Sequence, residues 1–323
     1  MQRVDLSIVI PALDEEKSIS ELHFLITKSL DKKNINYEII FVDDGSADST
    51  WNEIEKIINY NKNVKGIKFK KNYGKSDALD AAFKNSSGDF ILTMDADLQD
   101  DPYEIYKLLE IIKNKKFDLV SGWKKKRNDP LGKTIPSKFF NYVTRVFSGI
   151  HLNDFNCGIK IYRREVIESI DLYGEMHRYI PLIAKWNGYN FIGEKVVNHN
   201  KRKFGKTKFG MERFVRGFLD LLSVSFVYRF KHRPMHFFGS LGVLFFLVGF
   251  VSVGLITYEK ISKISQNIPL DLIRPVTDQP LFYVALVSII IGVQLFLVGF
   301  LSELIIQINS DKKRYKIDKT KNV

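Results

Sequence analysis

The chain has 323 residues, with 49 Lys and Arg against 37 Asp and Glu, a formal net charge of +12 and an isoelectric point near 9.4. Its length allows one large domain with an appendage, or two domains, and its charge indicates an anionic partner. The single cysteine, Cys157, excludes an intrachain disulfide and is typical of a reducing compartment. The first apolar run, Leu6–Ile10, is too short for a secretory signal peptide.

Up to about residue 122, strand-like apolar runs alternate with segments of helical periodicity. The expected strands are Leu6–Ile10, Tyr37–Val42, Val64–Lys68, Phe90–Met94 and Leu119–Gly122. The expected helices are Glu15–Leu30, Thr50–Tyr60, Lys75–Lys84 and Pro102–Lys115. This alternation predicts an α/β fold, a Rossmann-like, mostly parallel sheet with helices on both faces. In such a sheet, ligands bind beyond the carboxyl ends of the strands.

Polar loops follow three of these strands at the predicted carboxyl edge. The loops are residues 11–16, 43–50 and 95–101. In the second loop we expect Asp48 or Ser46 to cap the next helix, and Asp44 to face the ligand and accept hydrogen bonds from a nucleobase or ribose. Three polar loops at one edge predict a binding site there.

The third loop has the pattern of a metal site. In an extended chain Asp95, Asp97 and Gln99 share one face. Three oxygen donors suit a hard cation, and Mg²⁺ takes one or two carboxylates and completes its shell with water and substrate phosphates. One interpretation is therefore a Mg²⁺ or Mn²⁺ ion that holds a nucleotide diphosphate. The alternative is an acidic turn that caps the helix starting at Pro102.

The chain then turns basic in two places. Residues 124–138 are a solvated loop or a phosphate-binding segment, and a second basic segment with Gly205 follows the last expected strand, Tyr189–Asn198. A further strand is expected to reach Tyr162, and a helix to end at Trp186. The segment Asn72–Lys75 is either an ordinary helix start or a phosphate contact.

Two segments without Asp, Glu, Lys or Arg run from Met235 to Tyr258 and from Gln279 to Ser302. Each is long enough for a hydrocarbon core of ~30 Å. We predict a transmembrane hairpin within residues 233–310, with helices at about 235–258 and 280–302; buried helices of a soluble protein are the alternative. Apolar positions at helical spacing predict an amphipathic helix over residues 210–232, either in the membrane interface or against the soluble domain.

Basic residues flank both ends of this hairpin. Arg229, Lys231 and Arg233 precede it, and the tail of residues 311–323 is rich in lysine. By the positive-inside rule, both termini are expected in the cytoplasm and the loop between the helices outside. We therefore expect an integral protein of the cell (inner) membrane, whose residues 1–209 form a cytosolic domain.

Four motifs resemble family 2 glycosyltransferases of the dolichyl-phosphate mannose synthase group. They are Pro11-x-Leu13-x-Glu15, Val42-x-Asp44-Gly-Ser, Asp95-Ala-Asp97-Leu-Gln99-Asp and Arg202-x-x-Gly205-x-Thr207-Lys208. The resemblance covers about residues 4–232. It implies a GT-A catalytic domain over residues 1–209, which in bacterial members is often followed by paired membrane helices.

The resemblance also implies roles for individual residues. The implied donor nucleotide-sugar contacts are Pro11, Leu13, Glu15, Val42, Asp44, Asp95, Ala96, Asp97, Lys124, Arg202 and Lys208. The implied metal ligands are Asp95, Asp97 and Gln99, the implied catalytic residues are Asp97, Lys124 and Arg202, and the implied contacts to the acceptor phosphate are Lys133 and Ser137. The family usually has Arg at Lys124 and Lys133, and Lys supplies the charge without the planar fork. Asp14 replaces the usual Asn.

The implied function is inverting, metal-dependent transfer of a hexose from a nucleotide diphosphate sugar, of UDP-glucose or GDP-mannose type, to a polyisoprenyl (undecaprenyl or dolichyl) phosphate. The acceptor is already ionised, so no general base is required and His177 is expected to be structural. Alternatives are transfer to another lipid or polysaccharide acceptor, and a non-catalytic membrane scaffold. A processive synthase is disfavoured because the Gln-x-x-Arg-Trp pattern is missing from the sequence. A nucleic-acid binder would not explain the two apolar segments.

Overall fold

A computed structural model describes residues 3–31, 33–125, 141–146, 148–172, 174–201, 203–204, 223, 226, 230, 233–269 and 272–308. The chain forms two compact units, Met1–Val224 and Ser225–Val323. The predicted amphipathic helix over residues 210–232 and the basic tail of residues 311–323 lie outside the described residues, apart from three single positions in the helix.

The first unit contains a seven-stranded sheet with the order β3-β2-β1-β4-β6-β5-β7. Its strands are β1 (Leu6–Ala12), β2 (Tyr37–Asp43), β3 (Val64–Lys68), β4 (Phe90–Thr93), β5 (Leu119–Trp123), β6 (Lys160–Arg163) and β7 (Ile192–Val196). All neighbouring strands are parallel except β6, which is antiparallel to both β4 and β5. The predicted mostly parallel α/β sheet is confirmed.

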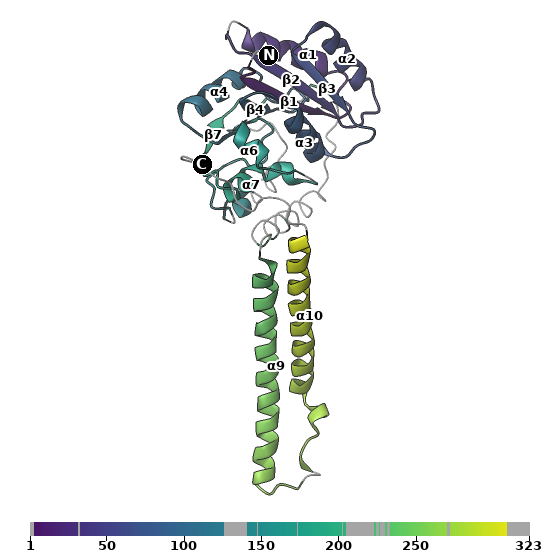
Figure 1. The fold of residues 1–323 in the computed structure, drawn as a ribbon, viewed down its shortest axis with the longest axis vertical. Helices are drawn as coiled ribbons and strands as arrows, with labels where there is room; N and C mark the ends of the chain where they lie inside the picture. Colours follow the sequence, from purple (N-terminus) through teal and green to yellow (C-terminus); the bar gives the residue numbers. More distant parts are fainter. Residues whose placement is uncertain are drawn as a thin grey trace. The chain divides into compact units, whose positions relative to one another are not determined.

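Helices cover the sheet (Figure 1). They are α1 (Ile19–Leu30), α2 (Thr50–Tyr60), α3 (Lys75–Asn85), α4 (Glu104–Asn114), α6 (Arg164–Glu168) and α7 (Ile180–Trp186), with a short 3-10 helix η1 (Met176–Arg178). Alternate residues of β1, namely Leu6, Ile8 and Ile10, share one core cluster with apolar residues of α1, α2 and α4. Because successive strand residues point to opposite faces, Val9 lies on the other face, where α3 packs on β1 and β2.

The helical and strand periodicities placed these elements well, but several boundaries differ, and two of these differences lie next to the polar loops. Helix α1 begins at Ile19, four residues later than predicted. Residues 16–18 form a turn, and the loop before it is hydrogen-bonded to the start of α2, where the Glu15 N–H donates to Thr50 Oγ1 at 2.7 Å. Strand β4 ends at Thr93, and residues 96–98 form a turn with Leu98 at φ +61°. The extended geometry predicted for the acidic loop is therefore wrong.

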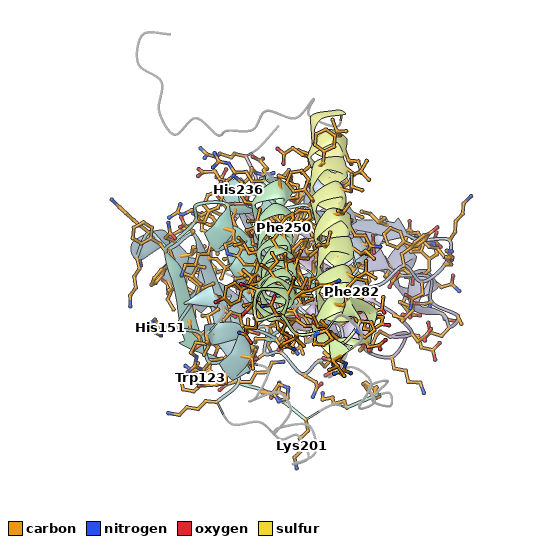
Figure 2. The ribbon with its side chains drawn as sticks, turned by 90° about the horizontal axis from the view of Figure 1, so that it is seen from below. Trp123, His151, Lys201, His236, Phe250 and Phe282 are labelled. Carbon is orange, nitrogen blue, oxygen red and sulfur yellow. The ribbon has the colours of Figure 1, made fainter. Side chains whose placement is uncertain are left out.

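The second unit is a helical hairpin of α9 (Pro234–Ser265) and α10 (Pro280–Ile308), with the 3-10 helix η3 (Val276–Asp278) in its connection. Both helices are long and apolar enough to cross a membrane. Most of their large apolar side chains are exposed, as for Phe250 at 64%, labelled in Figure 2. Helix α9 continues beyond the apolar segment, and an ion pair of 2.6 Å between Lys263 and Glu259 supports its last turns.

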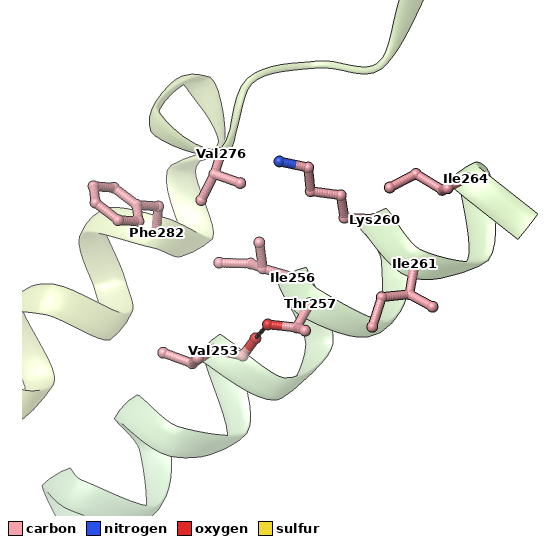
Figure 3. A pocket seen from close by; sticks show the side chains of 8 residues that line it. All are labelled: Val253, Ile256, Thr257, Lys260, Ile261, Ile264, Val276 and Phe282. Carbon is pink, nitrogen blue, oxygen red and sulfur yellow. Dashed lines mark hydrogen bonds between the residues drawn. The ribbon is translucent and has the colours of Figure 1, made fainter. Parts of the chain in front are cut away.

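Small residues let the two hairpin helices approach closely. A Cβ on Gly242 would lie 3.0 Å from the carbonyl oxygen of Gly292, and one on Gly249 would lie 2.5 Å from Ile289 Cγ1. Near the connection, a hollow of about 270 Å³ is lined mainly by apolar side chains of α9, with Val276 and Phe282 opposite (Figure 3). The hairpin is thus held by close backbone contact.

Candidate active site

Four polar loops lie at one edge of the sheet, where the parallel strands have their carboxyl ends. Strands β1, β2, β4 and β5 all end there, and the antiparallel β6 begins there, with Lys160 paired to both Thr93 and Ser121. The loops after β4 and β5 and the loop before β6 are consequently neighbours, although they are far apart in the sequence.

The loops after β1 and β2 are bonded to each other. Asp14 has a left-handed φ of +53°, its N–H donates to Ser46 Oγ at 2.9 Å, and its Oδ1 accepts the N–H of Ala47 at 3.0 Å. Asp and Asn both tolerate this backbone conformation. The Asp at position 14 therefore has a structural use that Asn, through its side-chain oxygen, would share.

The N-cap residue of helix α2 is Ser49, not Asp48 or Ser46 as predicted, but the Asp48 carboxylate bonds to the start of this helix. Its Oδ1 accepts the N–H of Thr50 at 2.9 Å, and its Oδ2 accepts the N–H of Glu16 at 3.2 Å. Helix α2 begins at Thr50, so this carboxylate satisfies an amide that the helix leaves without a partner.

Asp44 holds the segment that leads into α3. Its Oδ1 and Oδ2 accept the N–H groups of Tyr73 at 2.8 Å and Gly74 at 3.0 Å, and only 5% of the residue is exposed. Burial raises the pKa of this carboxyl, while the two N–H donors oppose that effect. The predicted contact of Asp44 with a nucleotide stays a prediction.

The acidic turn after β4 presents alternate residues to solvent. Asp95, Asp97 and Gln99 are partly exposed, and the intervening Ala96 and Leu98 are buried. Asp97 Oδ1 accepts the N–H of Gln99 at 3.1 Å. The three predicted metal ligands therefore lie on the solvent-exposed side of the turn, its open side. The backbone that places them there is a turn and not the extended chain that was expected.

Lys75, the first residue of α3, pairs with this turn. Its Nζ donates to Asp95 Oδ1, and about one third of each side chain is exposed (33% and 32%). Burial raises the pKa of the Asp95 carboxyl, but the ammonium groups of Lys75 and Lys124 outweigh burial and hold that pKa well below its usual range. Asp95 is therefore an anion at neutral pH.

Lys124 follows Trp123, the last residue of β5, which is labelled in Figure 2. Its Nζ forms an ion pair of 2.8 Å with Asp100, and the Lys124 side chain is only 13% exposed. Burial lowers the pKa of Lys124, but the Asp100 carboxylate more than offsets this and raises it above the usual value. The predicted donor-phosphate lysine is thus a fixed, permanently charged group beside the acidic turn.

The loop before β6 closes the other side of the turn. Gly158 has no room for a side chain, because a Cβ there would lie 2.6 Å from Asp95 Oδ2 and 2.8 Å from Asp100 Oδ2. Lys160 is 4% exposed, its Nζ donates to the Cys157 carbonyl, and burial lowers its pKa. Burial also raises the pKa of the Cys157 thiol to about 12, so that this cysteine stays protonated.

The second basic segment starts beside the acidic turn. The N–H of Asn200 donates to the Gln99 carbonyl at 2.8 Å, and His199 forms an isolated antiparallel bridge with Asp100. Lys201 is the next residue, so the chain enters the basic segment at this point. Arg202 and residues 205–210, which include Lys208, lie outside the described residues, as do Lys133 and Ser137.

His177 docks η1 onto the start of α3. Its N–H donates to Ser76 Oγ at 3.0 Å, and its Nδ1 lies 3.0 Å from the same hydroxyl. This is the structural role expected for His177.

The structure thus brings Asp95, Asp97, Gln99 and Lys124 together. Pro11 is the penultimate residue of β1, and Leu13 and Glu15 lie in the loop that follows this strand. Val42 is fully buried in β2, and its predicted contact with the nucleotide stays a prediction. Sequence reasoning missed Lys75, Lys160 and Asp100 as parts of this site. Lys75 carried a signal in its place after Asn72-Tyr-Gly74 at a helix start, and Asp100 in its place at the end of the acidic motif, whereas Lys160 carried none.

These residues fit a divalent cation. In the part of the chain that the structure describes, no three His, Cys, Asp or Glu side chains gather as a metal cluster. Asp95 and Asp97 offer two carboxylates, and Mg²⁺ characteristically binds one or two carboxylates and takes its other ligands from water and substrate phosphates. Gly158 lets the main chain approach the Asp95 carboxylate closely, and the Asp95 side chain is still 32% exposed.

Comparisons with known proteins agree with this architecture. The family model for glycosyl transferase family 2 matches residues 7–171. A dodecaprenyl-phosphate galacturonate synthase of Rhizobium johnstonii is 35% identical over 308 residues, 94% of this chain and 88% of that protein. An undecaprenyl-phosphate 4-deoxy-4-formamido-L-arabinose transferase of Shewanella sediminis is 34% identical over 225 residues, 69% of this chain and 67% of that protein.

Solved structures share the fold. TarS 1-349 of S. aureus, in complex with UDP-GlcNAc, has a TM-score of 0.51 at 21% identity and covers 69% of this chain and 67% of its own. Glucosyl-3-phosphoglycerate synthase of Mycobacterium tuberculosis, in complex with Mn²⁺, UDP and phosphoglyceric acid, has a TM-score of 0.53 at 17% identity and covers 70% of this chain and 78% of its own.

Proposed function

Because the chain belongs to glycosyltransferase family 2, we propose that it transfers one sugar from a nucleotide diphosphate sugar to a polyisoprenyl phosphate at the cytosolic face of the inner membrane. The observation that carries the proposal is the acidic turn Asp95–Gln99 at the carboxyl edge, flanked by the ammonium groups of Lys75 and Lys124, in a chain that also carries two apolar helices. The first relative is similar over nearly the whole chain, and its name states a polyprenyl-phosphate product.

The acceptor class follows from the second unit together with the relatives. A water-soluble acceptor requires no membrane helices, whereas the phosphate of an isoprenoid lipid lies at the membrane surface. The names of both relatives contain a polyprenyl phosphate and differ in the sugar. We therefore propose that the donor site determines which sugar is transferred. The panel of donors to be tested contains the predicted UDP-glucose and GDP-mannose, together with UDP-galacturonate.

Asp95 and Asp97, with Gln99, would hold Mg²⁺ or Mn²⁺, which when bound stabilises negative charge on the leaving diphosphate. Lys124 brings a fixed positive charge to the same edge, and Arg202 is proposed to add a second. Lys133 and Ser137 are proposed to hold the acceptor phosphate. The remaining predicted donor contacts, at Pro11, Leu13, Glu15, Val42, Asp44, Ala96 and Lys208, complete the proposed site.

The reaction then needs no enzyme base. A phosphate monoester carries close to two negative charges at neutral pH, so its oxygen attacks the anomeric carbon directly. The bond from that carbon to the diphosphate oxygen breaks as the new C–O bond forms on the opposite side. We propose inversion at the anomeric carbon without a covalent enzyme intermediate, which agrees with the structural role of His177.

The proposed arrangement in the membrane keeps the predicted boundaries. Residues 1–209 are the cytosolic catalytic domain, residues 210–232 an interfacial helix, residues 233–310 the membrane hairpin and residues 311–323 a cytosolic tail. The basic residues Arg229, Lys231 and Arg233 before the hairpin and the lysine-rich tail after it support this orientation.

The test is a transfer assay with the full chain in lipid nanodiscs, undecaprenyl phosphate, Mn²⁺ and the donor panel, with glycolipid detected by mass spectrometry. We expect one donor to give a lipid-phosphate-linked sugar of the corresponding mass. Hydrolysis of donors without any glycolipid, or transfer only to a soluble sugar, would contradict the proposed acceptor.

A further inference from the structure

Lys75 is a cationic residue at the proposed donor site that the known motifs do not assign. It opens α3, and its ammonium group is bonded to Asp95 Oδ1, one of the two carboxylates proposed to hold the cation. An ammonium group and a divalent cation repel each other and require the same carboxylate oxygen. The Lys75 ammonium group therefore occupies a carboxylate oxygen that is proposed to bind the metal.

The backbone on both sides of Lys75 is anchored. Asp44 accepts the N–H groups of Tyr73 and Gly74 directly before it, and Ser76 directly after it accepts the N–H of His177. Gly74 has a φ of +104°, which an L side chain rarely adopts, so the turn into α3 is specific. The position of the Lys75 Cα is thereby fixed, and only its flexible four-carbon side chain is left to move.

Of the three lysines that act on Asp95, Lys75 is the one placed to leave. The Lys124 side chain is 13% exposed and paired with Asp100, and Lys160 is 4% exposed and bonded to the Cys157 carbonyl. The Lys75 side chain is 33% exposed, so its ammonium group can leave Asp95 and be hydrated by solvent instead of staying buried without a partner.

We propose that the divalent cation displaces Lys75 from Asp95, and that the released ammonium group then pairs with the diphosphate of the nucleotide sugar. Lys75 is in this sense both a competitor of the free cation and a positioning residue for the donor. The second part of this proposal, the pairing of Lys75 with the diphosphate of the donor, rests on the proposed function. A purely structural ion pair between α3 and the turn after β4 is the alternative.

Two binding measurements on the full chain in nanodiscs separate these explanations. The first is the affinity for free Mn²⁺, read by electron paramagnetic resonance without nucleotide. The second is the affinity for UDP at saturating Mn²⁺. Lys75→Met removes the charge and keeps the length; we expect Mn²⁺ to bind about two- to fivefold more tightly, the range of a partly exposed ion pair, and UDP to bind more weakly by about the same factor.

Lys84→Met is the matched control. Lys84 lies on the same helix, is 67% exposed and pairs with Asp80, away from the proposed site. Neither affinity is expected to change in this variant. Lys75→Gln repeats the test with a polar side chain, and thermal unfolding of each variant shows that its fold is intact.

Opposite shifts of the two affinities support the proposal. Unchanged or weaker Mn²⁺ binding in both Lys75 variants would overturn it in favour of the structural ion pair, and tighter Mn²⁺ binding without weaker UDP binding would overturn the donor contact. Adding Asp95→Asn must abolish the gain in Mn²⁺ affinity. Free Mn²⁺ binding requires no acceptor, so failure of glycolipid synthesis in the unaltered protein would reject the proposed function and leave the displacement standing.

Discussion

Asp97 lies on the open side of the acidic turn, where its Oδ1 accepts the N–H of Gln99 at 3.1 Å. An asparagine oxygen accepts the same hydrogen bond, so Asp97→Asn removes the charge and keeps the turn. We expect glycolipid formation to fall by about 100-fold or more, the usual effect of removing one stabiliser of developing charge, and the thermal unfolding temperature to stay unchanged.

The control for this variant is Asp89→Asn. Asp89 lies just before β4, at the opposite edge of the sheet, in an exposed ion pair of 2.9 Å with Arg3. Its loss is expected to leave transfer unchanged. Equal activity of Asp97→Asn and the unaltered protein would reject the assignment of Asp97.

Glu38 gives a prediction for pH because it is buried and bonded to three other segments. Its carboxylate accepts hydrogen bonds from Ser7 and Ser87, at 2.6 Å from Ser7 Oγ and Ser87 N, and pairs with Lys65 at 2.6 Å. Burial raises the pKa of Glu38, but Lys65 and the hydroxyl and amide donors outweigh burial and lower it overall.

Because the folded-state pKa of Glu38 is below the unfolded value, the stability it contributes is present above about pH 4.5 and is lost as the pH falls through the folded-state pKa. Glu38→Gln is expected to reduce the free energy of unfolding by about 1–3 kcal/mol at pH 7, and by less at acid pH. Urea unfolding of the full chain in detergent measures both values. The same loss at both pH values would show that the charge is irrelevant.

At the level of single residues, the sequence predicted the polar loops and their common edge but not which polar atoms the fold itself uses. Asp44 was expected to face a ligand, and both of its oxygens hold the loop before α3. Lys75 lies 20 residues from Asp95 in the sequence, and its pairing arises only from the way α3 packs on the sheet. Such contacts depend on side-chain direction, which spacing along the chain does not reveal.

At the level of elements, periodicity located the strands and helices because their apolar faces are regular. It did not reveal that β6 is inserted antiparallel between β4 and β5, since the connection between β5 and β6 includes residues 126–140, whose sequence has no clear periodicity. This insertion is what brings Gly158 and Lys160 to the acidic turn. The alternation of strands and helices therefore predicts the edge of the sheet at which the site lies. The strand order determines which further segments contribute residues to that site.

The packing of α9 on α10 gives a prediction for this hairpin. A Cβ on Gly242 would lie 3.0 Å from the Gly292 carbonyl oxygen, whereas one on Gly254 would have no neighbour within 4 Å. Gly242→Leu is therefore expected to force the helices apart and to destabilise the hairpin by about 1–3 kcal/mol.

Gly254→Leu, on the same helix, introduces the same side chain on an open face and is expected to have no destabilising effect. Thermal unfolding of both variants in detergent, with the unaltered protein as reference, measures the difference. A similar unfolding temperature for the two variants would mean that close contact of α9 and α10 does not stabilise the hairpin.

At the level of the whole molecule, the proposed orientation predicts which residues are reached from outside the cell. In a Cys157→Ser background, Ser265→Cys at the end of α9 and Asn59→Cys on α2 each place one thiol at an exposed position. A membrane-impermeant maleimide is expected to label Ser265→Cys in intact cells and Asn59→Cys only after lysis. Labelling of Asn59→Cys in intact cells would reverse the proposed orientation.

The proposed function requires a cation and a diphosphate at the carboxyl edge of the sheet. A structure of the full chain with Mn²⁺ and UDP, with manganese located by its anomalous scattering, tests this directly. The account predicts manganese in direct coordination with the carboxylates of Asp95 or Asp97 and with the diphosphate of UDP. Manganese and UDP bound together at another place on the protein would contradict it.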